Sequence, residues 1–142
     1  MKLELITLTG PKFEENIYEV SLPTDEGTIT VLPHHVPIVT LAVPGIITIR
    51  RHKDDSDDKL EQFATNGGII EIAGDAVRLL VDEADHADDI VEAEARQALE
   101  RAKLAKQEAK DQLELDKAED LIDRAAVRLK VAELRRHRRP RA

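Results

Sequence analysis

The sequence predicts an α+β fold, with an antiparallel β-sandwich over residues 1–86 and a two-helix antiparallel hairpin over residues 87–142. Glycine and proline, which punctuate turns, are concentrated in the first half: all six glycines and five of the six prolines lie before residue 75. In that half apolar residues recur at every second position, which is typical of half-buried strands. In the second half they recur at steps of three and four, which is typical of amphipathic helices.

Short β-branched segments separated by turn residues predict the strands. In one clear segment, Ile47 and Ile49 alternate with Thr48 and Arg50. Similar alternation predicts strands around residues 17–22, 28–31, 70–72 and 77–81. The turn signals between the segments lie at residues 10–11, 23–27, 44–45, 53–59, 66–68 and 74–75. Many short strands with regular turns favour a β-sandwich or barrel.

The stretch "LPHHVPIVTLAVPG", from Leu32 to Gly45, interrupts an apolar segment with three prolines. Pro33 and Pro37 have no backbone N–H to donate, and they disfavour helix in the residues before them. We therefore expect residues 33–37 to form an exposed corner between two strands, and Pro44-Gly45 to form the next turn.

Two amphipathic patterns predict the helices, the first from Asp88 to Leu113 and the second from Asp116 to Arg136. Near the start of each pattern an aspartate, Asp89 or Asp116, is followed three residues later by a glutamate. This is the spacing of an N-cap with an acid at the third helical position. The alanines of the two apolar stripes are Ala95, Ala98, Ala102, Ala105, Ala109, Ala118, Ala125 and Ala132.

Alanine stripes let two helices approach closely, but each alanine buries little apolar area. At about 25 cal/mol per Å² of buried apolar surface, such a seam is weaker than one lined by leucine. The link between the stripes, "DQLELD", contains no glycine or proline. The sequence therefore permits two states, a closed antiparallel hairpin and a pair of helices opened along the chain.

The composition excludes several classes of function. No apolar run approaches the roughly 20 residues that a membrane-spanning helix needs, and the first residues lack a signal-peptide pattern. We therefore expect an intracellular, soluble chain, at most peripheral to a membrane. Cysteine is absent, aromatic residues make up 2% of the chain, and the net charge is −8. The absence of cysteine excludes disulfides and thiolate metal sites. The low aromatic content and the negative net charge argue against nucleic-acid partners.

Basic residues are concentrated at the C-terminal end. Residues 124–142 contain eight Lys or Arg and a single acid, Glu133, although the chain as a whole is acidic. A sign change of this kind favours an acidic partner, and a protein partner more than DNA.

The paired histidines and the carboxylate clusters are candidates for catalysis or metal binding, but their sequence pattern argues against both. His34 and His35 are adjacent, and neighbouring side chains of an extended chain point to opposite faces, so we expect a surface contact rather than a metal or acid–base pair. The carboxylates of residues 82–94 lack the glycine and final glutamate of a calcium-binding loop. Ser21 and Ser56 have no nucleophile context. We therefore predict no catalytic residue and no metal site.

Three segments in order resemble one known family. The epsilon subunit of the bacterial F-type rotary ATP synthase carries the pattern G-E-[LI]-G-[IV]-[LY]-P-G-H-A-P-L-[LV]-T, followed shortly by P-G-x-[IV]. The segment from Gly27 to Ile49, "GTITVLPHHVPIVTLAVPGIITI", is similar to it. The segments from Asn66 to Ile90 and from Ala125 to Arg136 resemble later parts of the same family. The residues in register with the first pattern are Gly27, Leu32, Pro33, His35, Pro37, Thr40, Pro44 and Gly45.

The resemblance implies a non-catalytic rotor subunit in the central stalk of a proton-translocating ATP synthase. It implies a sandwich that contacts the gamma subunit and the ring of c subunits, and a location on the cytoplasmic face of the cell inner membrane, as a peripheral protein. The contact candidates that follow from it are Thr28, His34, His35, Val36 and Pro37.

The resemblance also implies that the helices inhibit ATP hydrolysis by extending along gamma to the alpha and beta subunits of the catalytic head. There a basic face meets an acidic segment of beta, and in some members the folded hairpin binds ATP. The candidate residues for inhibition or nucleotide contact are Arg124, Arg128, Arg135 and Arg136.

Departures from the family pattern change two of these expectations. Thr28 stands where the family has a glutamate thought to face the c ring, and His34 stands where it has a glycine. The ATP-binding signature [IL]-D-x-x-R-A has Val91 in place of its aspartate and Glu94 in place of its arginine. We therefore expect ATP to bind weakly or not at all, and we predict no cofactor.

Two other functions are compatible with some of the same features. A free-standing adaptor, built as a sandwich with a helical hairpin, would bind an acidic protein and would not co-purify with gamma and c-ring components. A small hydrolase or lyase using His35 would need a nucleophile or metal, which the sequence does not offer.

Overall fold

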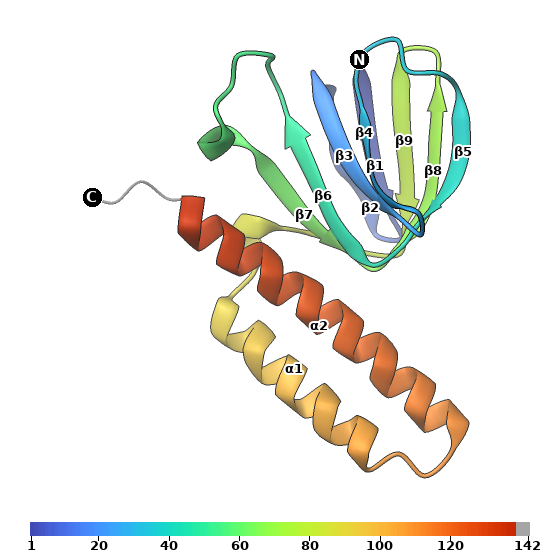
Figure 1. Ribbon diagram of the computed structural model, residues 1–142, viewed down its shortest axis with the longest axis vertical. Helices are drawn as coiled ribbons and strands as arrows, with labels where there is room; N and C mark the ends of the chain where they lie inside the picture. The colour runs from blue at the N-terminus through green and yellow to red at the C-terminus, as the bar shows by residue number, and fades with distance from the viewer. Residues whose placement is uncertain (139–142) are drawn as a thin grey trace.

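The computed structural model describes residues 1–138, which form a ten-stranded β-sandwich followed by two long helices (Figure 1). The strands are β1 (Lys2–Thr7), β2 (Gly10–Asn16), β3 (Glu19–Thr24), β4 (Gly27–Val31), β5 (Ile38–Ala42), β6 (Gly45–Arg50), β7 (Glu61–Thr65), β8 (Gly68–Ala73), β9 (Ala76–Val81) and β10 (Ala84–His86). The helices are α1 (Glu92–Gln107) and α2 (Gln112–Arg138). Short 3₁₀ turns η1 (Asp57–Lys59) and η2 (Ala87–Asp89) precede β7 and α1. The predicted fold class is therefore confirmed.

The strands follow one path, β10-β7-β6-β3-β5-β8-β9-β1-β2, with β4 attached to β3. The path folds into two layers because β3 and β5 are joined at a single residue pair, Thr24 and Ala42. One layer contains β10, β7, β6, β3 and β4, and the other contains β5, β8, β9, β1 and β2 (Figure 1). All pairings are antiparallel except that of β1 with β9, which is parallel. The sequence pattern did not predict this exception.

The core lies between the two layers and is built from the residues that alternate inward. Leu3 and Leu5 of β1 face Ile47 and Ile49 of β6 across this core, and all four are fully buried. At about 1.5–3 kcal/mol for each large apolar side chain removed from water, these layers give the sandwich most of its stability.

The corner between β4 and β5 forms as predicted. The backbone N–H of His35 donates to the Leu32 carbonyl at 3.2 Å, which closes the turn. His34 has a φ of 70°, the left-handed region that favours glycine. This matches the resemblance to the family pattern, in which His34 stands where the family has a glycine.

Helix α1 begins later than the sequence pattern predicted. Residues 87–89 form the 3₁₀ turn η2, and α1 begins at Glu92 with Val91 as its N-cap, without a side-chain capping bond. The prediction that Asp89 caps the helix is wrong. The backbone N–H of Asp88 donates instead to the Nδ1 atom of His86, at 3.0 Å, so a nearby side chain supplies its hydrogen-bond acceptor.

Helix α2 begins earlier than predicted, at Gln112 rather than at Asp116. The N–H of Glu114 donates to the Asp111 carboxylate at 2.8 Å, and the Glu114 carboxylate accepts from the N–H of Lys110 at 2.9 Å. The predicted cap at Asp116 is therefore wrong. The D-x-x-E spacing occurs twice within nine residues, and the first copy caps the helix.

Replacing Asp111 by Ala is expected to lower the free energy of unfolding by about 1 kcal/mol, because the N–H of Glu114 loses its acceptor. Urea denaturation followed by circular dichroism measures this change. Asp116→Ala is the matched control, since Asp116 lies inside α2 and accepts only an exposed side-chain bond from Gln112. A loss at Asp116 as large as that at Asp111 would contradict the capping assignment.

Candidate functional site

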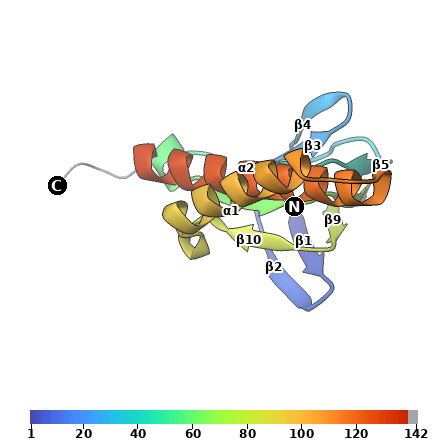
Figure 2. The ribbon, with the colours of Figure 1, turned by 90° about the horizontal axis from the view of Figure 1, so that it is seen from below.

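The hairpin contacts the sandwich through the C-terminal half of α2, while its tip projects away (Figure 1). Seen from below, the two helices lie side by side and antiparallel (Figure 2). Val131 and Ala132 of α2 are buried against a small apolar cluster that also contains Ala64, Ala87 and Ile90. Four of the six buried members of this cluster are alanines, and Ile46, Val127 and Leu129 pack against it partly buried. Alanines bury less apolar area than larger side chains, so the contact between the hairpin and the sandwich is modest.

Four arginines of α2 form a basic face, defined here as Arg124, Arg128, Arg135 and Arg136. The structure brings these predicted residues together, opposite an acidic segment defined as residues 83–92. The Nη1 atom of Arg128 lies 3.0 Å from the carboxylate of Asp85, and the Nε atom of Arg124 lies 3.6 Å from that of Glu83.

The other two arginines of the basic face contact later residues of the acidic segment. Arg135 donates from Nη1 to the Ala87 carbonyl at 2.8 Å and lies 3.9 Å from the carboxylate of Asp88. Arg136 donates to the carboxylate of Glu92 at 2.8 Å. The sequence predicted the arginines as a set but not these partners. The basic residues at 139–142 lie outside the described part of the chain.

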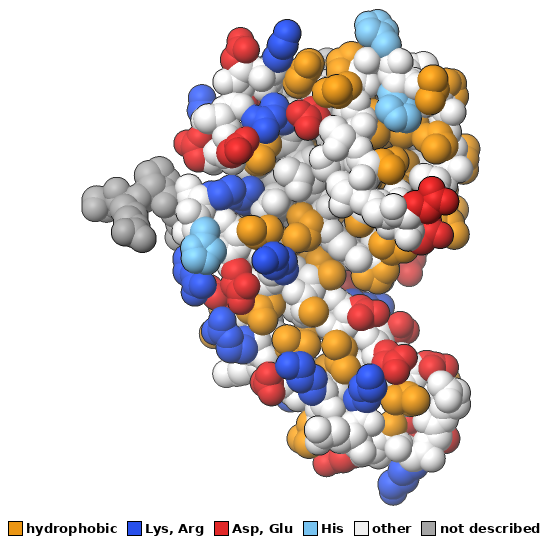
Figure 3. Space-filling view, in the orientation of Figure 1, with side chains coloured by type: hydrophobic (Ala, Val, Ile, Leu, Met, Phe, Trp, Pro, Cys, Tyr) orange, Lys and Arg blue, Asp and Glu red, His pale blue; other side chains and the backbone are white. Residues whose placement is uncertain are grey.

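A groove of about 650 Å³ lies between α1 and α2, beside the basic face. Alanines form its floor, and in space-filling view small apolar side chains lie between charged ones along the hairpin (Figure 3). Its charged lining consists of Glu83, Glu94, Arg101, Arg124 and Arg128. Carboxylates of Glu83 and Glu94 therefore stand among the guanidinium groups and offset part of their positive charge.

The predicted contact residues near the corner do not form one cluster. His34, His35, Val36 and Pro37 lie together between β4 and β5, and the Val36 side chain is exposed. Thr28 lies beside the β3–β4 turn, at the opposite end of β4. His35 Nδ1 lies 2.7 Å from the Val36 carbonyl, a local contact that shapes the corner.

An outward-facing apolar surface, which sequence reasoning missed, covers part of the outer face of the layer formed by β5, β8 and β9. Leu41 of β5 pairs with Ile69 of β8, which pairs with Leu80 of β9. Their exposed fractions are 64%, 41% and 38%, and Val39 on the same face of β5 is 73% exposed. We call Val39, Leu41, Ile69 and Leu80 the outer apolar face. Apolar side chains gather on the side of the sandwich where β5 and β8 lie (Figure 3).

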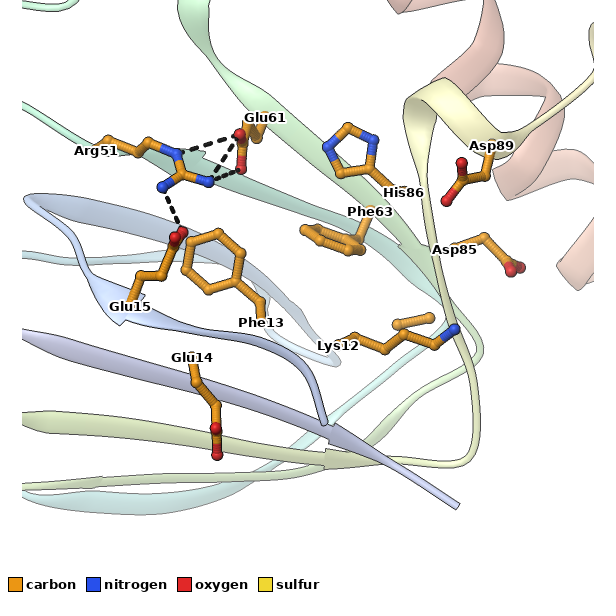
Figure 4. Close-up of a pocket in the computed structure, with 11 residues that line it drawn as sticks. Lys12, Phe13, Glu14, Glu15, Arg51, Glu61, Phe63, Asp85, His86 and Asp89 are labelled. Carbon is orange, nitrogen blue, oxygen red and sulfur yellow. Dashed lines mark hydrogen bonds and ion pairs between the residues drawn. The ribbon is translucent and has the colours of Figure 1, made fainter. Parts of the chain in front are cut away.

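A third surface closes the open side of the sandwich between β2 and β7. Arg51 donates to the Glu61 carboxylate at 3.0–3.1 Å, pairs with Glu15, and lies over the ring of Phe13 at 5.0 Å (Figure 4). Burial alone would lower the pKa of Arg51, but pairing with Glu61 and Glu15 outweighs burial and raises the pKa. The residues border a cavity of about 490 Å³. This arrangement joins β2 to the neighbouring strand β7.

Residues 1–138 contain no group of three or more His, Asp or Glu side chains arranged to hold a metal ion. Neither helix of the described chain combines the length and hydrophobicity needed to cross a bilayer.

Comparison with known sequences decides the family. Residues 1–87 match the family described as "ATP synthase, Delta/Epsilon chain, beta-sandwich domain". The chain is 34% identical over 138 residues to the ATP synthase epsilon chain of Herpetosiphon aurantiacus, covering 97% of this chain and 98% of that one. The chain belongs to the ATP synthase epsilon chain family. It is also 35% identical to the epsilon chain of Syntrophobacter fumaroxidans, over 94% of this chain and 96% of that one.

Two solved structures with the same fold are parts of ATP synthases. The first is that of the Euglena gracilis mitochondrial enzyme, described as "OSCP/F1/c-ring", which matches with a TM-score of 0.78 and 22% identity over 92% of this chain and 79% of that one. The second is the "central stalk/cring" of the Tetrahymena thermophila mitochondrial enzyme, with a TM-score of 0.61 and 14% identity over 93% of this chain and 96% of that one. Epsilon chains are non-catalytic subunits, so family membership disfavours both the hydrolase and the free-standing adaptor.

Proposed function

We propose that this chain is a rotor subunit of a proton-translocating F-type ATP synthase, which links the c ring and the gamma subunit to the catalytic head. The observation that carries the proposal is the outer apolar face, present in a chain of the epsilon family. Exposed contiguous apolar surface on a soluble domain marks a protein interface. Because the family belongs to a rotary enzyme, we assign that face to another stalk subunit, gamma.

The corner residues His34, His35, Val36 and Pro37 are proposed to contact the c ring, because they form an exposed loop at a position that matches the family motif. Thr28 lies at the other end of β4, so we assign it to a separate contact. The complex would hold the chain on the cytoplasmic face of the cell inner membrane without a membrane segment of its own. Residues 1–86 would be the docking unit and residues 87–142 the regulatory one.

The helices are proposed to restrain ATP hydrolysis in an open state, in which the basic face reaches the alpha and beta subunits. The apolar cluster between the hairpin and the sandwich has six buried residues, of which four are alanines. The free-energy difference between the states is therefore within the range that a partner with differential affinity can shift.

Deleting residues 88–142 tests this function directly. The truncated chain is expected to assemble into the ATP synthase and to raise the rate of ATP hydrolysis several-fold, because the inhibitory helices are gone. ATPase rates of purified complexes, normalised to the amount of this chain bound, measure the effect. Unchanged hydrolysis in a fully assembled complex would refute the brake, while failure to assemble would refute the docking role of residues 1–86.

Nucleotide binding in the groove is proposed to be weak or absent, because Glu83 and Glu94 stand among the arginines that would have to face phosphates. Calorimetry of the isolated chain is expected to show no micromolar affinity for ATP. The double variant Val91→Asp/Glu94→Arg restores the family signature and removes one carboxylate from the groove, so we expect it to bind ATP more tightly. Micromolar binding by the unmodified chain would contradict this proposal.

A further inference from the structure

The acidic segment and the basic face contact one another in the same order along the chain. Arg124 and Arg128 contact Glu83 and Asp85, and the later pair, Arg135 and Arg136, contacts residues 87–92. From residue 124 to residue 136 an α-helix rises about 18 Å, at about 1.5 Å per residue. A single strip of the chain therefore covers the basic face along its whole length.

This ionic strip lies where the apolar contact between hairpin and sandwich is small. Four of the six buried residues there are alanines, and Ile90 and Val131 are the larger two. Ile46, Val127 and Leu129 pack against them partly buried. Each partly exposed charge pair contributes little alone, but several pairs along one interface add to the modest apolar burial in favouring the closed state.

We propose that the acidic segment is an internal competitor for the basic face, occupying the arginines that an acidic protein surface would otherwise bind. The closed state is then held by the chain's own carboxylates rather than by a nucleotide, and it opens as ionic strength rises or when an acidic partner displaces the segment. The identity of that partner rests on the proposed function, whereas the intramolecular competition does not.

The pairs are accessible enough for salt to act on them. The side chains of Arg128 and Asp85 are 39% and 33% exposed, so ions screen their attraction. Raising NaCl from about 0.02 M to about 0.5 M shortens the Debye length from about 20 Å to about 4 Å. Loss of one such pair is expected to shift the closed-to-open ratio about threefold, and screening of all four about tenfold or more.

Distance measurement on the full-length isolated chain tests the competition. The chain has no cysteine, so Lys53→Cys in the sandwich and Lys117→Cys in α2 give two unique sites for spin labels. We expect one closed-state distance between the two labels at low salt, which gives way to a second, open-state distance as NaCl increases. A closed population that salt leaves unchanged would overturn the proposal.

Charge exchange provides the control for specificity. Arg128→Asp is expected to increase the open population, and adding Asp85→Arg to it is expected to restore the closed one. Lys130→Asp is the matched control, because Lys130 is exposed on α2 outside the basic face. If Lys130→Asp opens the hairpin as much as Arg128→Asp, or if the exchanged pair fails to restore closure while the sandwich stays folded, specific competition is refuted. These outcomes do not depend on ATPase activity, which reports on the proposed function separately.

Discussion

Replacing Gly68 by Ala is expected to lower the free energy of unfolding by about 3 kcal/mol, at the upper end of what overpacking costs. Gly68 begins β8 and lies between Ala42 of β5 and Val81 of β9. A Cβ atom added there would lie 2.1 Å from the Leu80 carbonyl oxygen and 2.8 Å from the Val81 Cα. Both are backbone atoms of a strand paired on both sides, so they cannot move aside without disturbing the sheet.

Equilibrium denaturation in urea measures this loss, and Gly74→Ala is the matched control. Gly74 lies in the β8–β9 turn with a φ of +60°, and a Cβ atom there has nothing within 4 Å. We expect that variant to lose only about 1 kcal/mol, from backbone strain. If Gly68→Ala is no less stable than Gly74→Ala, close packing of β8 on β9 is not what requires glycine at this position.

The fold could be predicted because its strongest signals are local. Ile47 and Ile49 alternate with polar residues in the sequence and are both fully buried in the structure. The alanines of the helical stripes behave in part the same way, since Ala95 and Ala102 of α1 and Ala118 and Ala125 of α2 are buried. Period and composition within a short window are enough to identify such elements.

Element boundaries could be predicted only roughly, because two equivalent signals competed. Asp111 and Asp116 both precede a glutamate by three residues, and both spacings suit an N-cap. The capping bonds form at Asp111. The position of the turn depends on where α1 ends, which is at Gln107, and the apolar pattern continued past that residue.

The surfaces were predicted least completely, because they depend on contacts between distant residues. The basic face was visible in the sequence, but its pairing with residues 83–92 joins positions 43 to 48 residues apart. The outer apolar face was hidden for another reason. When two adjacent residues such as Ile69 and Ile70 are both apolar, the sequence does not show which of them faces the core. The strand register and the burial show that Ile69 points outward.

Replacing Leu41 by Glu is expected to weaken binding to gamma by about 100-fold or more, because a carboxylate would be buried in an apolar interface without a partner. Leu41 is exposed on β5 in the outer apolar face, beside Ile69 and Val39. Stability of the isolated chain is expected to change by less than about 1 kcal/mol, since the side chain is in water there. Binding to purified gamma, measured by calorimetry, and the melting temperature separate the two effects.

Leu104→Glu is the control that separates the effect of the added charge from the effect of its position. Leu104 lies on α1 and is 53% exposed, so the same substitution introduces the same charge away from the sandwich. The control is expected to bind gamma as the unmodified chain does. Equal binding by Leu41→Glu would show that gamma docks elsewhere. Equal weakening by both variants would point to a general effect of added negative charge, since the chain already carries a net charge of −8. Only a loss of binding confined to Leu41→Glu therefore supports docking through the outer apolar face.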